Sequence, residues 1–171
     1  MPVLDFASGS GRNSVALEAA GLHVLRIDDV TASSPAPFAG SEGPFAAAIS
    51  THGLLHGTLL NITATLDAIA ALLEPGGLLY ATFGSEQDAR YGVGERRDDA
   101  TYAPLAGDEA GVPHTFFNRD TLTALLEPRF TIESLEERTV DDVAGNWAHS
   151  GRPLLNAVHW FVVATVSETN R

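Results

Sequence analysis

Glycine and acidic residues near the N-terminus have a spacing that suits binding of a nucleoside cofactor. The run Asp5-Phe6-Ala7-Ser8-Gly9-Ser10-Gly11-Arg12 follows a short apolar segment, and glycines at such a turn let a ligand contact the main chain. Asp28 follows a second apolar segment, where a carboxylate can accept hydrogen bonds from both ribose hydroxyls. A dinucleotide fingerprint has a third glycine, but Ser14 stands there, which disfavours a nicotinamide or flavin site.

Predicted strands and helices alternate around this turn. The apolar patterns predict strands over residues 3–7, 23–28, 45–51, 78–83, 130–137 and 156–166, and helices over 13–20 and 59–73, with a short helix from Asn118 or Asp120 through Leu126. Glu74-Pro75-Gly76-Gly77 predicts a turn before the strand at 78–83. This alternation predicts one α/β domain over residues 1–171, with a Rossmann-like, mainly parallel sheet.

Two long segments interrupt the pattern. Residues 85–113 are polar and too numerous for a simple connection, so we expect a lid or substrate loop there. Residues 138–153 predict a second long loop. Because lids fold over the bound substrate, we expect the first of these loops, residues 85–113, to select the substrate.

Four segments, in order along the chain, resemble motifs of the class I S-adenosylmethionine-dependent methyltransferases. Residues 3–12 are similar to motif I, usually D-x-G-x-G-x-G, with Ala7 at the position of its first glycine. The likeness continues through Asp28, through Ser50-Thr51-His52-Gly53-Leu54-Leu55-His56, and through residues 73–79. The resemblance covers nearly the whole chain and implies that the last strand is antiparallel and that S-adenosylmethionine is the cofactor.

The resemblance assigns roles to particular residues. In this family the acid that matches Asp5 orders the glycine loop, the loop holds the methionine moiety, and the acid that matches Asp28 holds the ribose. The segment after the fourth strand flanks the sulfonium, so His52 and His56 are the best-placed histidines. We take His56 as the candidate catalytic base, with a structural hydrogen-bonding histidine as the alternative. The expected cofactor-binding residues are Asp5, Ala7, Gly9, Gly11, Arg12, Asp28, Thr51 and His52.

The chain also departs from the family pattern. Family members have a helix before the first strand, and a further helix and strand after the ribose acid. Residues 29–44 are rich in turn formers, so we expect no regular helix between Asp29 and Pro44 and a sheet that lacks this helix and strand. A truncated N-terminus leaves the methionine end open, or closed by a second copy of the chain, and a homodimer is therefore considered.

Aromatic, histidine and charged residues in the loops suit a pocket for a small polar or aromatic acceptor. The residues assigned to substrate binding are Arg90, Tyr91, His114, Trp147 and His149, with plain packing as the alternative for the aromatic rings. These segments are loosely similar to a small-molecule methyltransferase group of the tellurite-resistance type. A three-histidine metal site from His114, His149 and His159 fits no known ligand spacing, so no metal is expected.

The composition of the chain limits which binding partners are expected. The 171 residues carry a net charge of −12, and such a surface repels phosphate backbones, which argues against nucleic acid as a partner. No apolar stretch reaches the length of about 18 residues that a membrane span needs, so no membrane partner is expected. The absence of cysteine is compatible with a cytoplasmic protein.

Three functions are compatible with these features. The first is an S-adenosylmethionine-dependent methyltransferase that acts on a small molecule. The second is a degenerate methyltransferase fold that serves as a binding or regulatory subunit without catalysis. The third is a nicotinamide oxidoreductase, against which Ser14 argues.

Overall fold

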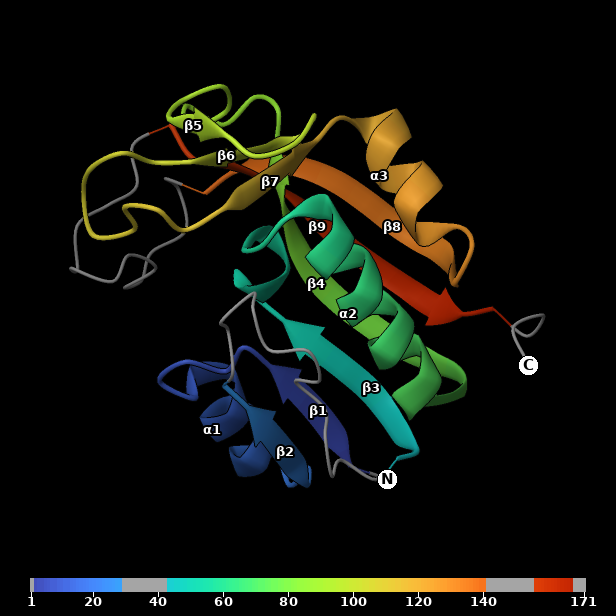
Figure 1. The fold of residues 1–171 in the computed structure, drawn as a ribbon. Coiled ribbons are helices and arrows are strands. Elements are labelled where there is room, and N and C mark those ends of the chain that lie inside the picture. Colours follow the sequence, from blue (N-terminus) through green and yellow to red (C-terminus); the bar gives the residue numbers. More distant parts are fainter. Residues whose placement is uncertain (1, 29–42, 141–155, 168–171) are drawn as a thin grey trace.

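The structure is a computed structural model that describes residues 2–28, 43–140 and 156–167. Its centre is a mixed sheet in the order β2-β1-β3-β4-β7-β6-β5, with β9 paired to β4 and β8 paired to β9 (Figure 1). The predicted absence of a helix between Asp29 and Pro44 falls mainly on residues outside the described part, as do Trp147, His149 and most of the loop predicted over residues 138–153.

The first half of the sheet is parallel, as the sequence predicts. Strand β1 pairs with β2 on one side and with β3 on the other, and β3 pairs with β4, all in parallel register. The bounds of these strands are β1 Val3–Phe6, β2 Val24–Ile27, β3 Phe45–Ser50 and β4 Leu73–Ser85. The predicted turn at residues 74–77 lies inside β4, where the register with β3 shifts between Phe45 and Ala47.

Helices connect these strands. The helix α1, Arg12–Ala19, follows the glycine turn, and Gly21 with φ 86° donates its amide to the Glu18 carbonyl at the helix end. The helix α2, Leu59–Leu72, begins with a capping box from Thr58 and lies across β3 and β4 in Figure 1. It buries Ile62, Leu66 and Ile69 against the sheet, so its apolar face fixes the strands that carry the site.

The end of the chain forms the predicted antiparallel hairpin. Strand β9, Val158–Val166, is antiparallel to both β4 and β8, Phe130–Thr139. The helix α3, Arg119–Leu126, precedes β8 and is capped by Asn118, one of the two predicted caps. The prediction of a mainly parallel α/β sheet with an antiparallel last strand is thus confirmed.

Residues 85–113, predicted as a lid or substrate loop, contain regular structure. Strands β5, Glu95–Arg96, and β6, Thr101–Ala103, lie within this segment, and β6 pairs with β7, His114–Phe117. Strand β7 continues the parallel pairing of β4 at Gly84 and Ser85. Sequence patterns miss these strands because each is only two to four residues long and lacks a periodic apolar run. The segment is therefore attached to the sheet edge that leads to the site.

No helix in the described part of the chain has the length and apolar character to cross a membrane.

Candidate functional site

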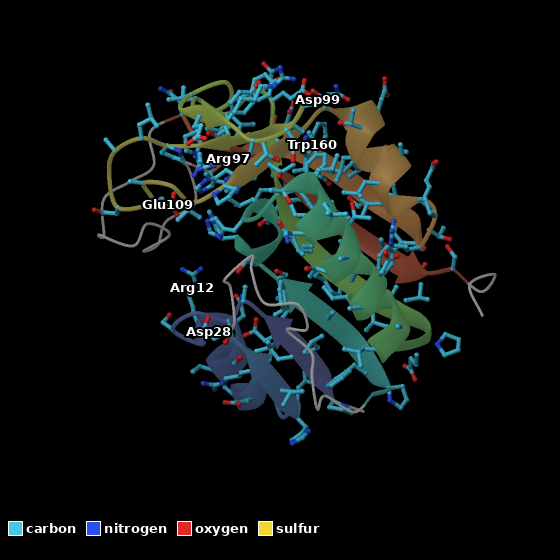
Figure 2. All side chains as sticks on the ribbon, in the orientation of Figure 1. Arg12, Asp28, Arg97, Asp99, Glu109 and Trp160 are labelled. Carbon is cyan, nitrogen blue, oxygen red and sulfur yellow. The ribbon has the colours of Figure 1, made fainter. Side chains whose placement is uncertain are left out.

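The glycine turn between β1 and α1 has the backbone of a ligand-binding loop. Ala7, Gly9 and Gly11 all have positive φ, at 58°, 51° and 74°. Ala7 thus adopts, at the position where motif I has its first glycine, a conformation that costs a non-glycine residue free energy. The Gly9 amide donates to Asp28 Oδ1 at 2.9 Å, so the acid at the end of β2 supports the turn directly. Figure 2 shows Asp28 close to the exposed Arg12 at this edge of the sheet.

Asp5 in β1 forms a buried hydrogen bond to the helix that follows the glycine turn. Its carboxylate is fully buried and accepts a hydrogen bond from the Ser14 hydroxyl, and burial raises the pKa of Asp5 above its ordinary value. Ser14, which stands where a dinucleotide site has its third glycine, therefore bonds Oδ2 of the buried acid, whereas Oδ1 has no hydrogen-bond partner among the described residues. Asp5 thus connects β1 to α1, on either side of the glycine turn, through a partner that the sequence motif does not identify.

The end of β3 joins the turn to the acceptor side. Thr51, predicted as a cofactor-binding residue, accepts a hydrogen bond at Oγ1 from Asn13 Nδ2 of α1 at 2.8 Å, which connects it to the helix after the glycine turn. His52 has a positive φ of 67°, and its amide donates to Thr82 Oγ1 of β4 at 2.9 Å. This strained turn holds the His52 ring at the carboxyl edge of the sheet.

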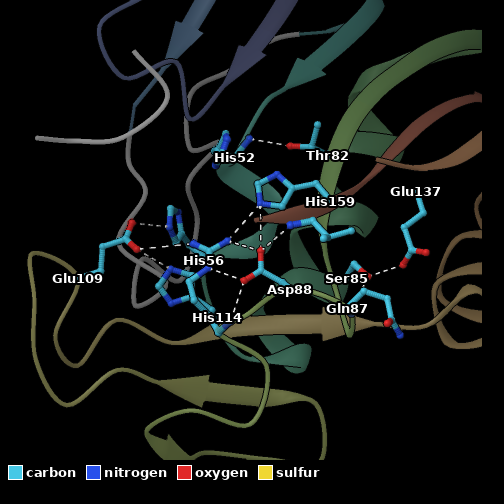
Figure 3. Close-up of polar contacts among 12 residues, drawn as sticks. His52, His56, Thr82, Ser85, Gln87, Asp88, Glu109, His114, Glu137 and His159 are labelled. Carbon is cyan, nitrogen blue, oxygen red and sulfur yellow. Dashed lines mark hydrogen bonds and ion pairs between the residues drawn. The ribbon is translucent and has the colours of Figure 1, made fainter. Parts of the chain in front are cut away.

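His52 faces a second histidine, His159, from β9. Their ring centroids are 4.6 Å apart in an edge-to-face arrangement (Figure 3). Burial lowers the pKa of His52 to about 3 and that of His159 to about 4, and the positive charge of Arg90 acts in the same direction on both. Both rings are therefore neutral near pH 7 and are weak bases.

Arg90 and Asp88 form a half-buried ion pair next to His159. Arg90 Nε and Nη2 donate to the two oxygens of Asp88, each at 2.8 Å, and Nη2 lies 3.2 Å from His159 Nε2. Asp88 also accepts from the Val158 amide at 3.0 Å, which attaches the segment after β4 to the start of β9. Hydrogen bonds from Arg90 lower the pKa of Asp88, although burial opposes the shift.

Glu109 lies between His56 and His114 (Figure 3). Its Oε1 is 3.4 Å from His56 Nε2 and its Oε2 is 3.1 Å from His114 Nε2, while the two rings are 4.8 Å apart. Hydrogen bonds with these histidines lower the pKa of Glu109, so the carboxylate is ionised near neutral pH. Arg90 Nη1 lies 4.0 Å from Glu109 Oε2 and connects this group to the Asp88 pair.

The fold brings together four of the residues predicted for the cofactor and acceptor sides of the site. His52, His56, Arg90 and His114 belong to one connected cluster. Tyr91 instead packs its ring against Tyr102 and Phe116, at centroid distances of 5.5 and 5.8 Å, which favours the packing alternative. The predicted residues Trp147 and His149 lie outside the described part of the chain.

Three members of the cluster were not assigned from the sequence. Asp88 is detectable as the acid two positions before Arg90, and His159 lies in a predicted strand whose alternation places its ring on the site side. Glu109 has no local signal, because its neighbours in the site come from residues 56, 90 and 114.

This chain is similar to known proteins in its structure rather than in its sequence. No family model matches the sequence, and no curated protein matches it. The solved structures that are similar include an S-adenosylmethionine-dependent methyltransferase from Methanosarcina mazei, with 17% identity, 96% of this chain and 91% of that chain covered, and a TM-score of 0.69. A 1,6-didemethyltoxoflavin-N1-methyltransferase from Burkholderia thailandensis, bound to S-adenosylhomocysteine, has 20% identity, coverage of 97% and 71%, and a TM-score of 0.68.

A glycopeptide N-methyltransferase in complex with S-adenosylhomocysteine is also similar, with 15% identity, 97% of this chain and 81% of that chain covered, and a TM-score of 0.58. The chain has the Rossmann-like fold of the class I S-adenosylmethionine-dependent methyltransferases.

Proposed function

We propose that this chain binds S-adenosylmethionine and transfers its methyl group to a small-molecule acceptor. The observation that carries the proposal is the hydrogen bond from the Gly9 amide to Asp28, at the carboxyl edge of β1 and β2. This bond supports the proposal because it holds Asp28, the acid proposed to bind the ribose, beside the glycine turn, where nucleoside cofactors bind in this fold. Three similar solved structures with S-adenosylmethionine chemistry support the same reading.

The proposed cofactor site uses the predicted loop residues. Ala7, Gly9 and Gly11 would receive the methionine moiety against the main chain, with Arg12 at the exposed rim of the turn. The second carboxylate oxygen of Asp28, Oδ2, would accept a hydrogen bond from a ribose hydroxyl. His52, at the end of β3, would border the sulfonium, since its turn projects the ring toward His159 and the acceptor cluster.

The acceptor side is proposed to be the cluster around Arg90, His56 and His114. Methyl transfer from a sulfonium needs alignment of the acceptor and, for a hydroxyl or amine acceptor, loss of a proton. His52 and His159 have lowered pKa values and are poorly suited to remove it. His56, beside the ionised Glu109, is better suited to promote that loss.

A small acceptor is favoured over a polymer. The net charge of −12 disfavours nucleic acid, and two of the similar structures are methyltransferases named for a toxoflavin precursor and for a glycopeptide. A cytoplasmic location, supported by the absence of cysteine, and a homodimer remain parts of this proposal.

The cofactor proposal is tested by the substitution Asp28→Ala. It removes charge-assisted hydrogen bonds to the ribose and one to the Gly9 amide, so affinity for S-adenosylhomocysteine should fall by about 1–3 kcal/mol. Isothermal titration calorimetry measures the change. The matched control is Glu127→Ala, which removes an exposed carboxylate at the end of α3 and should leave the affinity unchanged.

Equal affinity in the Asp28→Ala variant and the native chain would place the ribose elsewhere. A folded native chain that binds neither S-adenosylmethionine nor S-adenosylhomocysteine would contradict methyl transfer by this chain alone. That result would support the alternative of a methyltransferase fold that serves as a binding or regulatory subunit.

A further inference from the structure

His56 and His114 are positioned side by side by the backbone. An isolated antiparallel bridge joins the two residues, and the Gly57 amide donates to the Pro113 carbonyl at 2.8 Å. The buried Thr115 hydroxyl donates to the Gly57 carbonyl at 2.7 Å and fixes the same crossing from the next residue pair. Residues opposite one another in such a bridge project their side chains from the same face. The two imidazoles are therefore held together by main-chain contacts, independently of Glu109.

The hydrogen bond of His114 at Nδ1 determines which ring nitrogen faces Glu109. His114 is buried, and its Nδ1 lies 2.9 Å from the Val112 carbonyl, which can only accept a hydrogen bond. Nδ1 therefore donates to this carbonyl, which orients the ring so that Nε2 faces Glu109 Oε2 at 3.1 Å. A hydrogen bond or a bound cation can join these two atoms. A histidine bonded through Nδ1 to a carbonyl is also the arrangement that orients a metal-binding imidazole.

We propose that His56, Glu109 and His114 bind a divalent transition-metal ion, through the two Nε2 atoms and the Glu109 carboxylate. All three ligand atoms lie within 4.8 Å of one another, and the two printed nitrogen–oxygen separations are 3.4 and 3.1 Å. Tetrahedral coordination with bonds of about 2.1 Å separates ligands by roughly 3.4 Å, so little movement is needed. Two imidazoles and one carboxylate are the ligand set of zinc and non-haem iron sites that keep a position for substrate.

The site is accessible from one side. His114 is buried, whereas the side chains of His56 and Glu109 keep 15% and 25% of their surface exposed, so an ion and a further ligand can enter there. This metal site differs from the sequence-based expectation of no metal, because the spacing of Glu109 from the two histidines matches no known ligand pattern.

The role of the metal rests on the proposed methyl transfer. A metal-bound hydroxyl of the acceptor has a lowered pKa, so its proton passes to solvent before transfer. The oxygen lone pair then forms the new carbon–oxygen bond, and the carbon–sulfur bond breaks with its electron pair going to sulfur, which releases S-adenosylhomocysteine. His56 acts on the acceptor through the metal, since a nitrogen bound to the ion does not accept the proton itself.

The test is zinc titration of the purified, untagged chain after treatment with a chelator. We expect saturable binding at a single site by calorimetry, and a loss of affinity of about 100-fold or more in Glu109→Gln. Glu109 is partly exposed, so this substitution creates no buried cavity. The matched controls are Asp108→Asn, which changes the exposed acid next to Glu109, and His23→Gln, which removes an exposed histidine outside the cluster. Both should bind zinc like the native chain.

Absence of saturable zinc binding, or equal affinity in Glu109→Gln and Asp108→Asn, would overturn the metal site and leave Glu109 as a hydrogen-bonding partner of His56 and His114. Thermal unfolding of each variant checks that the fold is retained. Titration of S-adenosylhomocysteine into the same samples separates the two proposals. Zinc binding without nucleoside binding would support the metal site and contradict methyl transfer, and the reverse result would remove only the metal.

Discussion

Two largely buried histidines should make the stability of the chain depend on pH. The pKa values of His52 and His159 are lowered to about 3 and about 4 from 6.5. At pH values between these lowered pKa values and 6.5, the unfolded chain binds more protons than the folded chain. The free energy of unfolding therefore falls as the pH falls. Going from pH 7 to pH 5 should cost about 2 kcal/mol for each histidine. Urea unfolding at the two pH values measures this loss.

Substitution identifies the residues responsible. The variants His52→Gln and His159→Gln should each lose part of the difference between pH 7 and pH 5. His23→Gln should keep all of it, because His23 is exposed. A difference that is the same in all three variants would assign the pH dependence to groups other than these two histidines; the buried Asp5, whose pKa is raised, acts in the opposite direction.

At the scale of elements, the contact between β4 and β7 determines where the acceptor cluster lies. A Cβ atom added at Gly84 would lie 2.7 Å from the Thr115 carbonyl oxygen and 3.0 Å from Phe116 Cδ1. A backbone oxygen cannot move aside as a side chain does, so Gly84→Ala should push β7 away from β4. We expect a loss of about 1–3 kcal/mol in the free energy of unfolding, measured with urea.

The same variant tests how the elements divide the function. Strand β7 begins at His114, whereas the glycine turn follows β1 on the other side of β3. Gly84→Ala should therefore weaken zinc binding while affinity for S-adenosylhomocysteine stays within about tenfold, or 1.4 kcal/mol. Unchanged stability would show that β7 is not in tight contact with β4, and a collapse of nucleoside binding would show that the two sites are coupled.

For the whole molecule, periodic and motif-bearing segments were predictable and contacts between distant segments were not. The glycine turn, α2 and the antiparallel β9 follow from apolar patterns or from the family resemblance. Strands β5 and β6 are too short to produce a pattern, so they were expected to be part of a loop. Glu109 lies in the segment between β6 and β7. It reaches His56 only because β7 and the segment after β3 meet in space. Ser14 was interpreted only as a missing glycine, although it bonds Asp5.

The last prediction is that the whole chain unfolds in one step. Strand β4 pairs with β3, β7 and β9, so the parallel half, the short strands and the final hairpin all share one strand. The apolar core is likewise continuous, from Leu4 in β1 to Trp160 in β9. A unit connected in this way cannot lose one part without exposing the core of another, which is the condition for two-state behaviour. Urea unfolding followed by far-UV circular dichroism and by tryptophan fluorescence should give coincident transitions. Separate midpoints for the two signals would instead divide the chain into more than one cooperative unit and contradict the single domain expected over residues 1–171.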